Sequence, residues 1–145
     1  MKLHKVKYAI AGGWAVALHG AVRGTIDLDL LVVLTLNNLE RAQMALNSTG
    51  LQSRLPLVAK DVFEFREEYI RNQKMLAWRF VNPLNQAEVV DLLIIEDLQD
   101  MATTTVRIGK DQIPIVALED LIQMKKRSGR PQDLEDIKAL ETIRK

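Results

Sequence analysis

The stretch GGWAVALHGAVRGTIDLDLLVV, residues 12–33, places two aspartates, Asp27 and Asp29, at alternate positions of an otherwise apolar predicted strand. Aspartate is depleted from strands, and two carboxylates on one pleated face repel each other. Residues two apart on a strand lie on the same side, about 7 Å apart along the chain. Either this side of the strand faces water, or a positively charged group lies against the two carboxylates.

The composition is that of an ordinary globular protein. The 145 residues are 48% hydrophobic and 27% charged, which suits one domain with a buried core. A net charge of +1 gives no general attraction to nucleic acids or membranes. Because cysteine is absent, disulfides, thiolate zinc sites and cysteine nucleophiles are excluded. The two histidines lack partners at ligand spacing, so a metal would be a hard cation held by oxygen, such as Mg²⁺ or Mn²⁺.

The N-terminal residues imitate a secretory signal, because the basic MKLHKVK is followed by the apolar YAIAGGWAVAL. Gly12 and Gly13 interrupt the apolar run, and no clean cleavage pattern of small residues follows. No apolar stretch reaches the length of a membrane span. We therefore expect a cytoplasmic protein with no membrane partner.

Hydrophobic periodicity predicts an α/β fold. The expected strands are 5–11, 25–34, 75–81, 88–95, 106–108 and 112–115, and the expected helices are 14–19, 36–48, 117–127 and 132–144. Thr35 is a suitable N-cap for the second helix, and the VFEF segment at 62–65 is compatible with a further strand. We expect a mixed, partly antiparallel sheet covered by helices, with a helical C-terminal segment. Residues 1–145 would form a single domain, with a core at 1–115 and C-terminal helices at 116–145.

Gly12 and Gly13 lie between a predicted strand and a predicted helix. Without side chains, they allow backbone N–H groups at the helix start to approach an anion closely, and the helix dipole adds a fractional positive charge. This arrangement suits a phosphate group. An ordinary tight turn has the same sequence signature, so the glycine pair leaves both interpretations open.

Asp91 is a third notable acid, because apolar strand formers flank it in VVDLLII. On its own face of the predicted strand lie Val89, Leu93 and Ile95, so periodicity does not expose it. A buried carboxylate needs a cation or hydrogen-bond donors to stay charged. If strand 88–95 lies beside strand 25–34, three carboxylates meet, and Mg²⁺ would relieve their repulsion.

Taken in order, Gly12-Gly13, the pattern Arg23-x-Thr25-x-Asp27-x-Asp29 and the lone Asp91 resemble the nucleotidyltransferase superfamily typified by DNA polymerase beta. The tail LEDLIQMKKRSGRPQDLEDIKAL, residues 118–140, is similar to the closing segment of small nucleotidyltransferases related to abortive-infection toxins and antibiotic-modifying enzymes. The chain departs from the family pattern in its second glycine, where many relatives have serine, and in the apolar Ile26.

The resemblance implies roles for these residues. Asp27 and Asp29 would hold two Mg²⁺ ions, or Mn²⁺, that bridge a nucleoside triphosphate. Asp91 would complete the shell of the catalytic ion and accept the proton of the attacking hydroxyl. The implied nucleotide-binding residues are Gly12, Gly13, Arg23, Thr25 and Lys125.

The basic residues also have purely structural interpretations. Arg23 is also compatible with an ordinary loop arginine paired to a nearby acid. Lys125 belongs to a run of cations that suits a helix C-terminus. We expect Arg130, Asp133 and Asp136 to form ion pairs that fix the last helix.

The reaction implied by the resemblance is transfer of a nucleoside monophosphate from an NTP to an acceptor hydroxyl, with release of pyrophosphate. Two alternatives stay open: an inactive nucleotide- or partner-binding domain, and one component of a toxin–antitoxin pair. The acceptor is a small molecule, an RNA or a protein. With only 145 residues, a partner protein or a homodimer would supply the remainder of its pocket.

Overall fold

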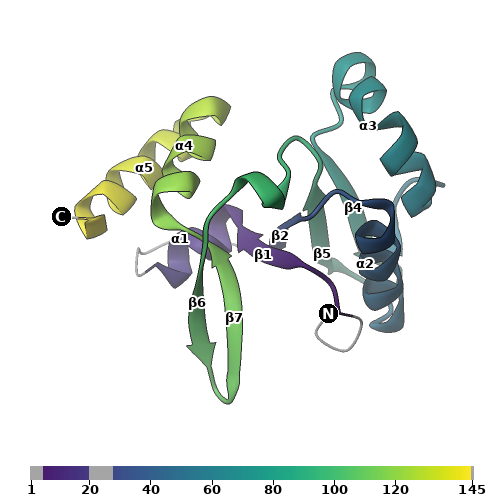
Figure 1. The fold of residues 1–145 in the computed structure, drawn as a ribbon, viewed down its shortest axis with the longest axis horizontal. Coiled ribbons are helices and arrows are strands. Elements are labelled where there is room, and N and C mark those ends of the chain that lie inside the picture. Colours follow the sequence, from purple (N-terminus) through teal and green to yellow (C-terminus); the bar gives the residue numbers. More distant parts are fainter. Residues whose placement is uncertain (1–4, 20–27, 145) are drawn as a thin grey trace.

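The computed structural model describes residues 5–19 and 28–144, which form a seven-stranded mixed sheet with helices on two sides of the molecule (Figure 1). The predictions for Arg23, Thr25 and Asp27 lie outside the described residues. In chain order the elements are β1 (Tyr8–Ala11), α1 (Gly12–Leu18), β2 (Leu28–Val32), α2 (Leu36–Ser48), β3 (Gln52–Ser53), α3 (Ala59–Gln73), β4 (Ala77–Asn82), β5 (Asn85–Leu93), the short 3₁₀ helix η2 (Leu98–Asp100), β6 (Thr103–Ile108), β7 (Asp111–Val116), α4 (Leu118–Ser128) and α5 (Pro131–Arg144).

The strand order across the sheet is β3-β4-β5-β2-β1-β7-β6. The central strand β2 pairs antiparallel with β1 and parallel with β5, and β1 pairs parallel with β7. The outer pairs β3–β4, β4–β5 and β6–β7 are antiparallel. The expected mixed α/β fold is therefore confirmed, including the hairpin of β4 and β5.

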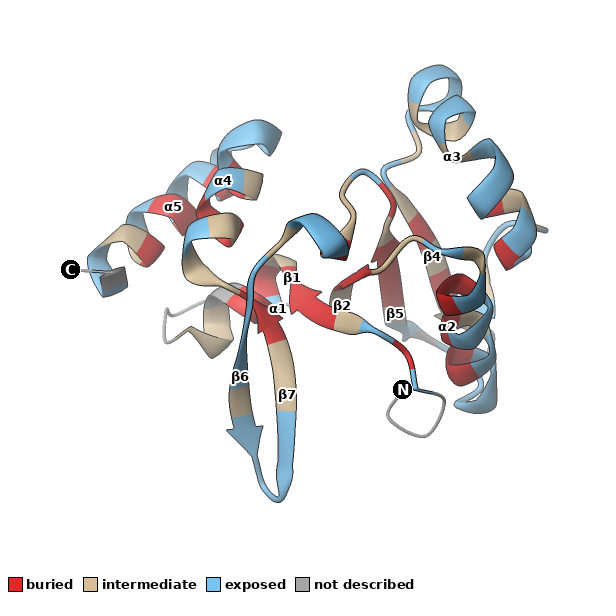
Figure 2. Cartoon of the chain, viewed as in Figure 1, coloured by how far each residue is buried: buried red, intermediate tan, exposed pale blue. Residues whose placement is uncertain are grey.

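The helices form two groups in Figure 1, with α2 and α3 beside β4 and β5, and α1, α4 and α5 at the other end. Buried residues lie along the middle of the sheet and on the inward faces of the helices (Figure 2). Trp78 and Phe80 are fully buried on one face of β4, with ring centroids 4.6 Å apart. Because side chains alternate between the two faces of a strand, Arg79, which lies between Trp78 and Phe80, points to the other face.

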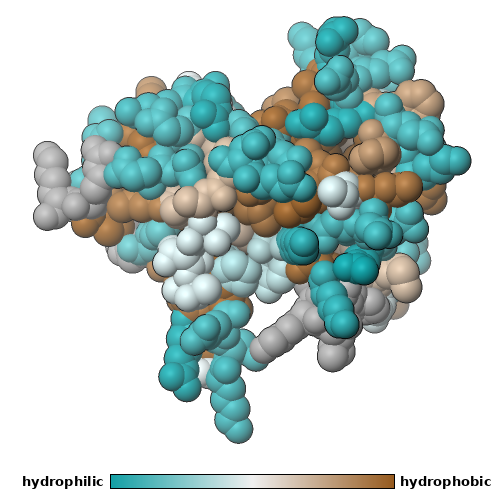
Figure 3. All heavy atoms as spheres, viewed as in Figure 1, coloured by the Kyte–Doolittle hydropathy of each residue, from teal (hydrophilic) through white to brown (hydrophobic). Residues whose placement is uncertain are grey.

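The β6–β7 hairpin projects from the body of the protein, and its outer half is exposed (Figure 2). The tip of this projection is hydrophilic in the space-filling view (Figure 3), whereas hydrophobic residues form a band across the middle of the same face. In the described parts of the chain, no helix combines the length and apolar character needed to cross a bilayer.

Local sequence patterns correctly predicted several helices and their ends. The helix expected at 36–48 is α2, and the Thr35 hydroxyl accepts a hydrogen bond from the Asn38 N–H at 3.2 Å, as an N-cap does. The last two helices are separated at Gly129, which adopts a φ of +66°, and α5 begins at Pro131. The first helix begins at Gly12 instead of residue 14, so the glycine pair opens the helix.

The strand expected at 62–65 is wrong, because these residues lie within the helix α3. The VFEF pattern imitates strand alternation, but its two phenylalanines, Phe63 and Phe65, are exposed. The Asp61 carboxylate instead accepts a hydrogen bond from the Val58 N–H at 3.0 Å and satisfies a backbone donor at the helix start.

Candidate active site

A row of register partners crosses four strands at the middle of the sheet. Arg79 on β4 lies opposite Asp91 on β5, Asp91 lies opposite Asp29 on β2, and Asp29 lies opposite Ala11 on β1. Register partners lie on the same face, and adjacent strands are about 4.8 Å apart. The two acids that the sequence places 62 residues apart are therefore immediate neighbours, as expected if strands 25–34 and 88–95 pair. The third acid of that prediction, Asp27, lies outside the described residues.

Asp91 is buried, with a relative exposure of 7%, and Arg79 binds it. The guanidinium donates from Nε to Oδ1 at 2.9 Å and from Nη2 to Oδ2 at 3.0 Å, so both carboxylate oxygens accept a hydrogen bond. This two-pronged geometry is the strong form of an arginine–carboxylate pair. It supplies the cationic partner that the apolar surroundings of Asp91 require.

Gly12 lies directly against the second acid. The residue follows Ala11, the register partner of Asp29, and adopts a φ of +62°. A Cβ atom at this position would lie 2.2 Å from Asp29 Oδ2 and 2.9 Å from Asp29 Cγ. Only glycine leaves room for the carboxylate and accepts this backbone conformation without strain.

These residues open into a cavity of about 740 Å³ between the sheet and the two C-terminal helices. Four of the expected site residues line it, from four different elements: Gly12, Asp29, Asp91 and Lys125. Gly13 is the buried neighbour of Gly12 at the start of α1. The apolar part of the lining is contributed by Leu76, Ala77, Leu93, Ile95, Leu121 and Met124.

The helical wall of the cavity contains a buried charge network. The Lys125 Nζ lies 3.2 Å from Asp133 Oδ1 and 3.1 Å from Asp136 Oδ2, and all three side chains are less than a tenth exposed. The more exposed Arg130 donates from Nε to Asp133 Oδ2 at 2.9 Å. The ion pairs expected of Arg130, Asp133 and Asp136 are therefore present, and Lys125 joins them.

The network changes the acidity of its members. Burial acts to raise the pKa of Asp133, but hydrogen bonds from Arg130, Ser128 and Lys125 outweigh it and hold that pKa well below its usual range. The hydrogen bond to Asp133 raises the pKa of Arg130, and the negative charge of Asp29 acts in the same direction. The charge of Arg130 is thus stabilised chiefly by Asp133 on α5, with a smaller contribution from Asp29 on the sheet.

Sequence reasoning did not identify two contacts of this site. The first is made by Arg79. The sequence feature that could have indicated it is a single charged residue between Trp78 and Phe80 in an alternating strand. The second is an ion pair across the cavity rim, in which Arg127 Nη2 lies 2.7 Å from Glu96 Oε1. No local pattern connects Arg127 on α4 to a residue just after β5, because the contact depends on how α4 packs.

The donor set fits a divalent ion. Carboxylate oxygens on adjacent strands are the hard ligands that Mg²⁺ and Mn²⁺ prefer, and the absent Cβ of Gly12 leaves space for one of them. Asp29 and Asp91 would supply oxygens to such an ion. Within residues 5–19 and 28–144, no three acidic or histidine side chains are close enough to form a metal-binding group.

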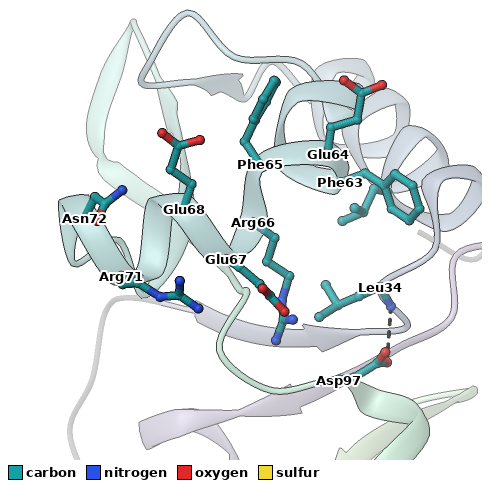
Figure 4. Close-up of a pocket in the computed structure, with 11 residues that line it drawn as sticks. Leu34, Phe63, Glu64, Phe65, Arg66, Glu67, Glu68, Arg71, Asn72 and Asp97 are labelled. Carbon is teal, nitrogen blue, oxygen red and sulfur yellow. Dashed lines mark hydrogen bonds between the residues drawn. The ribbon is translucent and has the colours of Figure 1, made fainter.

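A second cavity, of about 560 Å³, lies beneath α3 and contains none of the expected site residues. Figure 4 shows Arg66 and Arg71 among glutamates of α3, with Asp97 accepting a hydrogen bond from the Leu34 N–H. Asp97 also accepts from the Gln99 N–H at 3.1 Å, so its carboxylate fastens two backbone segments together. These contacts are structural, and the acids on the sheet define the candidate active site.

Gly12→Ala provides a direct test of the close approach between Gly12 and Asp29. The new Cβ would displace the Asp29 carboxylate, and a misplacement of about 1 Å can lower a reaction rate by about 100-fold. Gly109→Ala is the matched control, because Gly109 has the same φ of +62° but a Cβ there would have no heavy atom within 4 Å. Each variant should lose about 1–2 kcal/mol of stability to backbone strain. Equal rates of the nucleotidyl transfer that the resemblance implies, measured for the two variants, would contradict the role of Gly12.

The strand order and the glycine-led helix after β1 give a fold like that of two solved structures, an adenylyltransferase and a nucleotidyltransferase-like protein. The chain is similar to the lincosamide antibiotic adenylyltransferase LnuA, solved with lincomycin bound, with a TM-score of 0.63 and 16% identity over 98% of this chain and 90% of that one. It is also similar to an antigenic nucleotidyltransferase-like protein from Paracoccidioides brasiliensis, with a TM-score of 0.56 and 20% identity over 96% of this chain and 69% of that one. No protein-family model and no curated protein matches the sequence.

Proposed function

We propose that this chain is a metal-dependent nucleotidyltransferase that moves a nucleoside monophosphate from an NTP to an acceptor hydroxyl and releases pyrophosphate. The observation that supports it most directly is the register pairing of Asp29 and Asp91 in one cavity beside Gly12. A lone structural acid would not require a second acid beside it or a glycine that makes room for its carboxylate.

Each residue has a role in this proposal. Asp27, Asp29 and Asp91 would hold Mg²⁺, for which Mn²⁺ would be a substitute, and the bound ions would offset the triphosphate charge and align the reacting groups. Asp91 accepts the proton of the attacking hydroxyl. The phosphates would lie against the backbone of Gly12 and Gly13, and Arg23 and Thr25 would also bind the nucleotide.

Cationic side chains at the α4–α5 wall, each paired with an acid in this structure, support the binding of a triphosphate. Lys125, Arg127 and Arg130 all line the cavity opposite the acids. Lys125 would contribute to nucleotide binding as a member of the buried network that also holds Arg130. The apolar lining near Leu93 and Ile95 leaves room for part of an acceptor beyond Asp91. We place the enzyme in the cytoplasm.

One observation favours a second function, an inactive nucleotide- or partner-binding domain. Arg79 binds both oxygens of Asp91, and Asp91 is the group that accepts the proton in the proposed reaction. A permanent pair would preserve the fold and the cavity without turnover.

Release of pyrophosphate separates the two functions. We expect the purified protein, given labelled NTPs, Mg²⁺ and separate pools of cellular small molecules, RNA and proteins, to release pyrophosphate with one pool and to label that acceptor. The reaction should stop when Mg²⁺ is chelated. Binding of NTP without pyrophosphate in any pool would reject the enzymatic function and support the binding domain.

A further inference from the structure

The pair of Arg79 and Asp91 has a consequence for divalent ions that rests on the proposed metal site. A carboxylate offers about four lone-pair positions on its two oxygens, and a two-pronged arginine uses one on each. An ion shared by Asp29 and Asp91 would need an oxygen of Asp91 as ligand. It would also bring a double positive charge close to the guanidinium, which repels it.

Arg79 is placed so that it can give up this contact without disturbing the strand. Its side chain is 40% exposed and lines the cavity, whereas that of Asp91 is 10% exposed. The residues on either side, Trp78 and Phe80, are fully buried on the opposite face and keep β4 in place. The Trp78 Nε1–H also donates to Ser53 Oγ at 2.8 Å, which fastens β4 to β3.

We propose that Arg79 is a positioning residue that holds the Asp91 carboxylate oriented before the metal ion arrives, and that competes with that ion for its oxygens. The arginine replaces part of the positive charge that the acids require. The presence of Arg79 weakens divalent-ion binding, because the ion must displace the guanidinium from an oxygen of Asp91. Once the ion is bound, the guanidinium lies on the wall of the cavity that would hold the negatively charged triphosphate.

Binding of Mn²⁺ alone, followed by electron paramagnetic resonance at fixed pH and low ionic strength, tests the competition. Arg79→Gln should bind Mn²⁺ about tenfold more tightly than the wild type, the scale of one charge-assisted hydrogen bond that no longer has to be given up. Arg107→Gln, an exposed arginine on the projecting hairpin, is the matched control and should leave the affinity unchanged. Arg79→Lys keeps the charge without the two-pronged contact and should lie between the wild type and Arg79→Gln.

Asp91→Asn, alone and combined with Arg79→Gln, distinguishes failure of the inference from failure of the site. Both variants should bind Mn²⁺ weakly, because the gain from Arg79→Gln requires the carboxylate. The role of Arg79 is overturned if Arg79→Gln and Arg79→Lys both bind Mn²⁺ no more tightly than the wild type while Asp91→Asn still weakens binding. The proposed metal site would then remain supported. Equal Mn²⁺ affinity of Asp91→Asn and the wild type removes Asp91 from the metal site, and with it the inference.

Discussion

Asp91→Asn is expected to lower the rate of nucleotidyl transfer at least about a thousandfold, within the range known for loss of a general base. Asparagine keeps the size of the side chain and one oxygen that can accept from Arg79, but it cannot take the proton of the acceptor hydroxyl. It is also a poorer ligand for Mg²⁺. The measurement is the initial rate of pyrophosphate release, with the acceptor pool that the wild-type protein uses.

The loss should occur without unfolding. Asp91 lies between Trp78–Phe80 packing on one side of the sheet and the open cavity on the other, so the core does not depend on its charge. We expect a far-UV circular dichroism spectrum like that of the wild type. Asp100→Asn, an exposed acid of η2, controls for the loss of a negative charge and should keep full activity. Wild-type turnover by Asp91→Asn would refute the proposed chemistry.

Much of the fold was predictable because local signals and burial agree. The strand that becomes apolar after Asp29 is the central β2, with Leu31 and Val32 fully buried. The placement of Asp91 beside Asp29 was expected on the condition that strands 25–34 and 88–95 pair, which β2 and β5 do. The apolar surroundings of Asp91 indicated in addition the need for a cation or a hydrogen-bond donor. That need specifies a charged neighbour but not its identity, and Arg79 on β4 also meets it.

The remainder depended on tertiary packing. Phe63 and Phe65 alternate as in a strand yet lie exposed on α3, so hydrophobic pattern alone misplaced this segment. Lys125 carried two valid interpretations, as a helix-end cation and as a phosphate ligand. Its burial between Asp133 and Asp136 follows from the way α5 packs back against α4, which no spacing in the sequence encodes.

Lys125→Met is expected to lower the free energy of unfolding by about 3–5 kcal/mol, the cost of breaking a buried ion pair by removing one partner. Methionine matches the length of lysine, so packing changes little, but the Asp133 and Asp136 carboxylates would lose the ammonium group between them. Urea denaturation gives the measurement. Lys126→Met, the exposed neighbour on the same helix, should change stability by no more than about 0.5 kcal/mol.

The double variant Lys125→Met/Asp136→Asn shows whether charge or packing causes that loss. Removing one carboxylate relieves its repulsion with Asp133, which keeps its hydrogen bond from Arg130, so part of the lost stability should return. A loss below about 1 kcal/mol in Lys125→Met would mean that the network contributes little to stability. Lys125 would then act chiefly in nucleotide binding, and its loss would appear in NTP affinity instead of in unfolding.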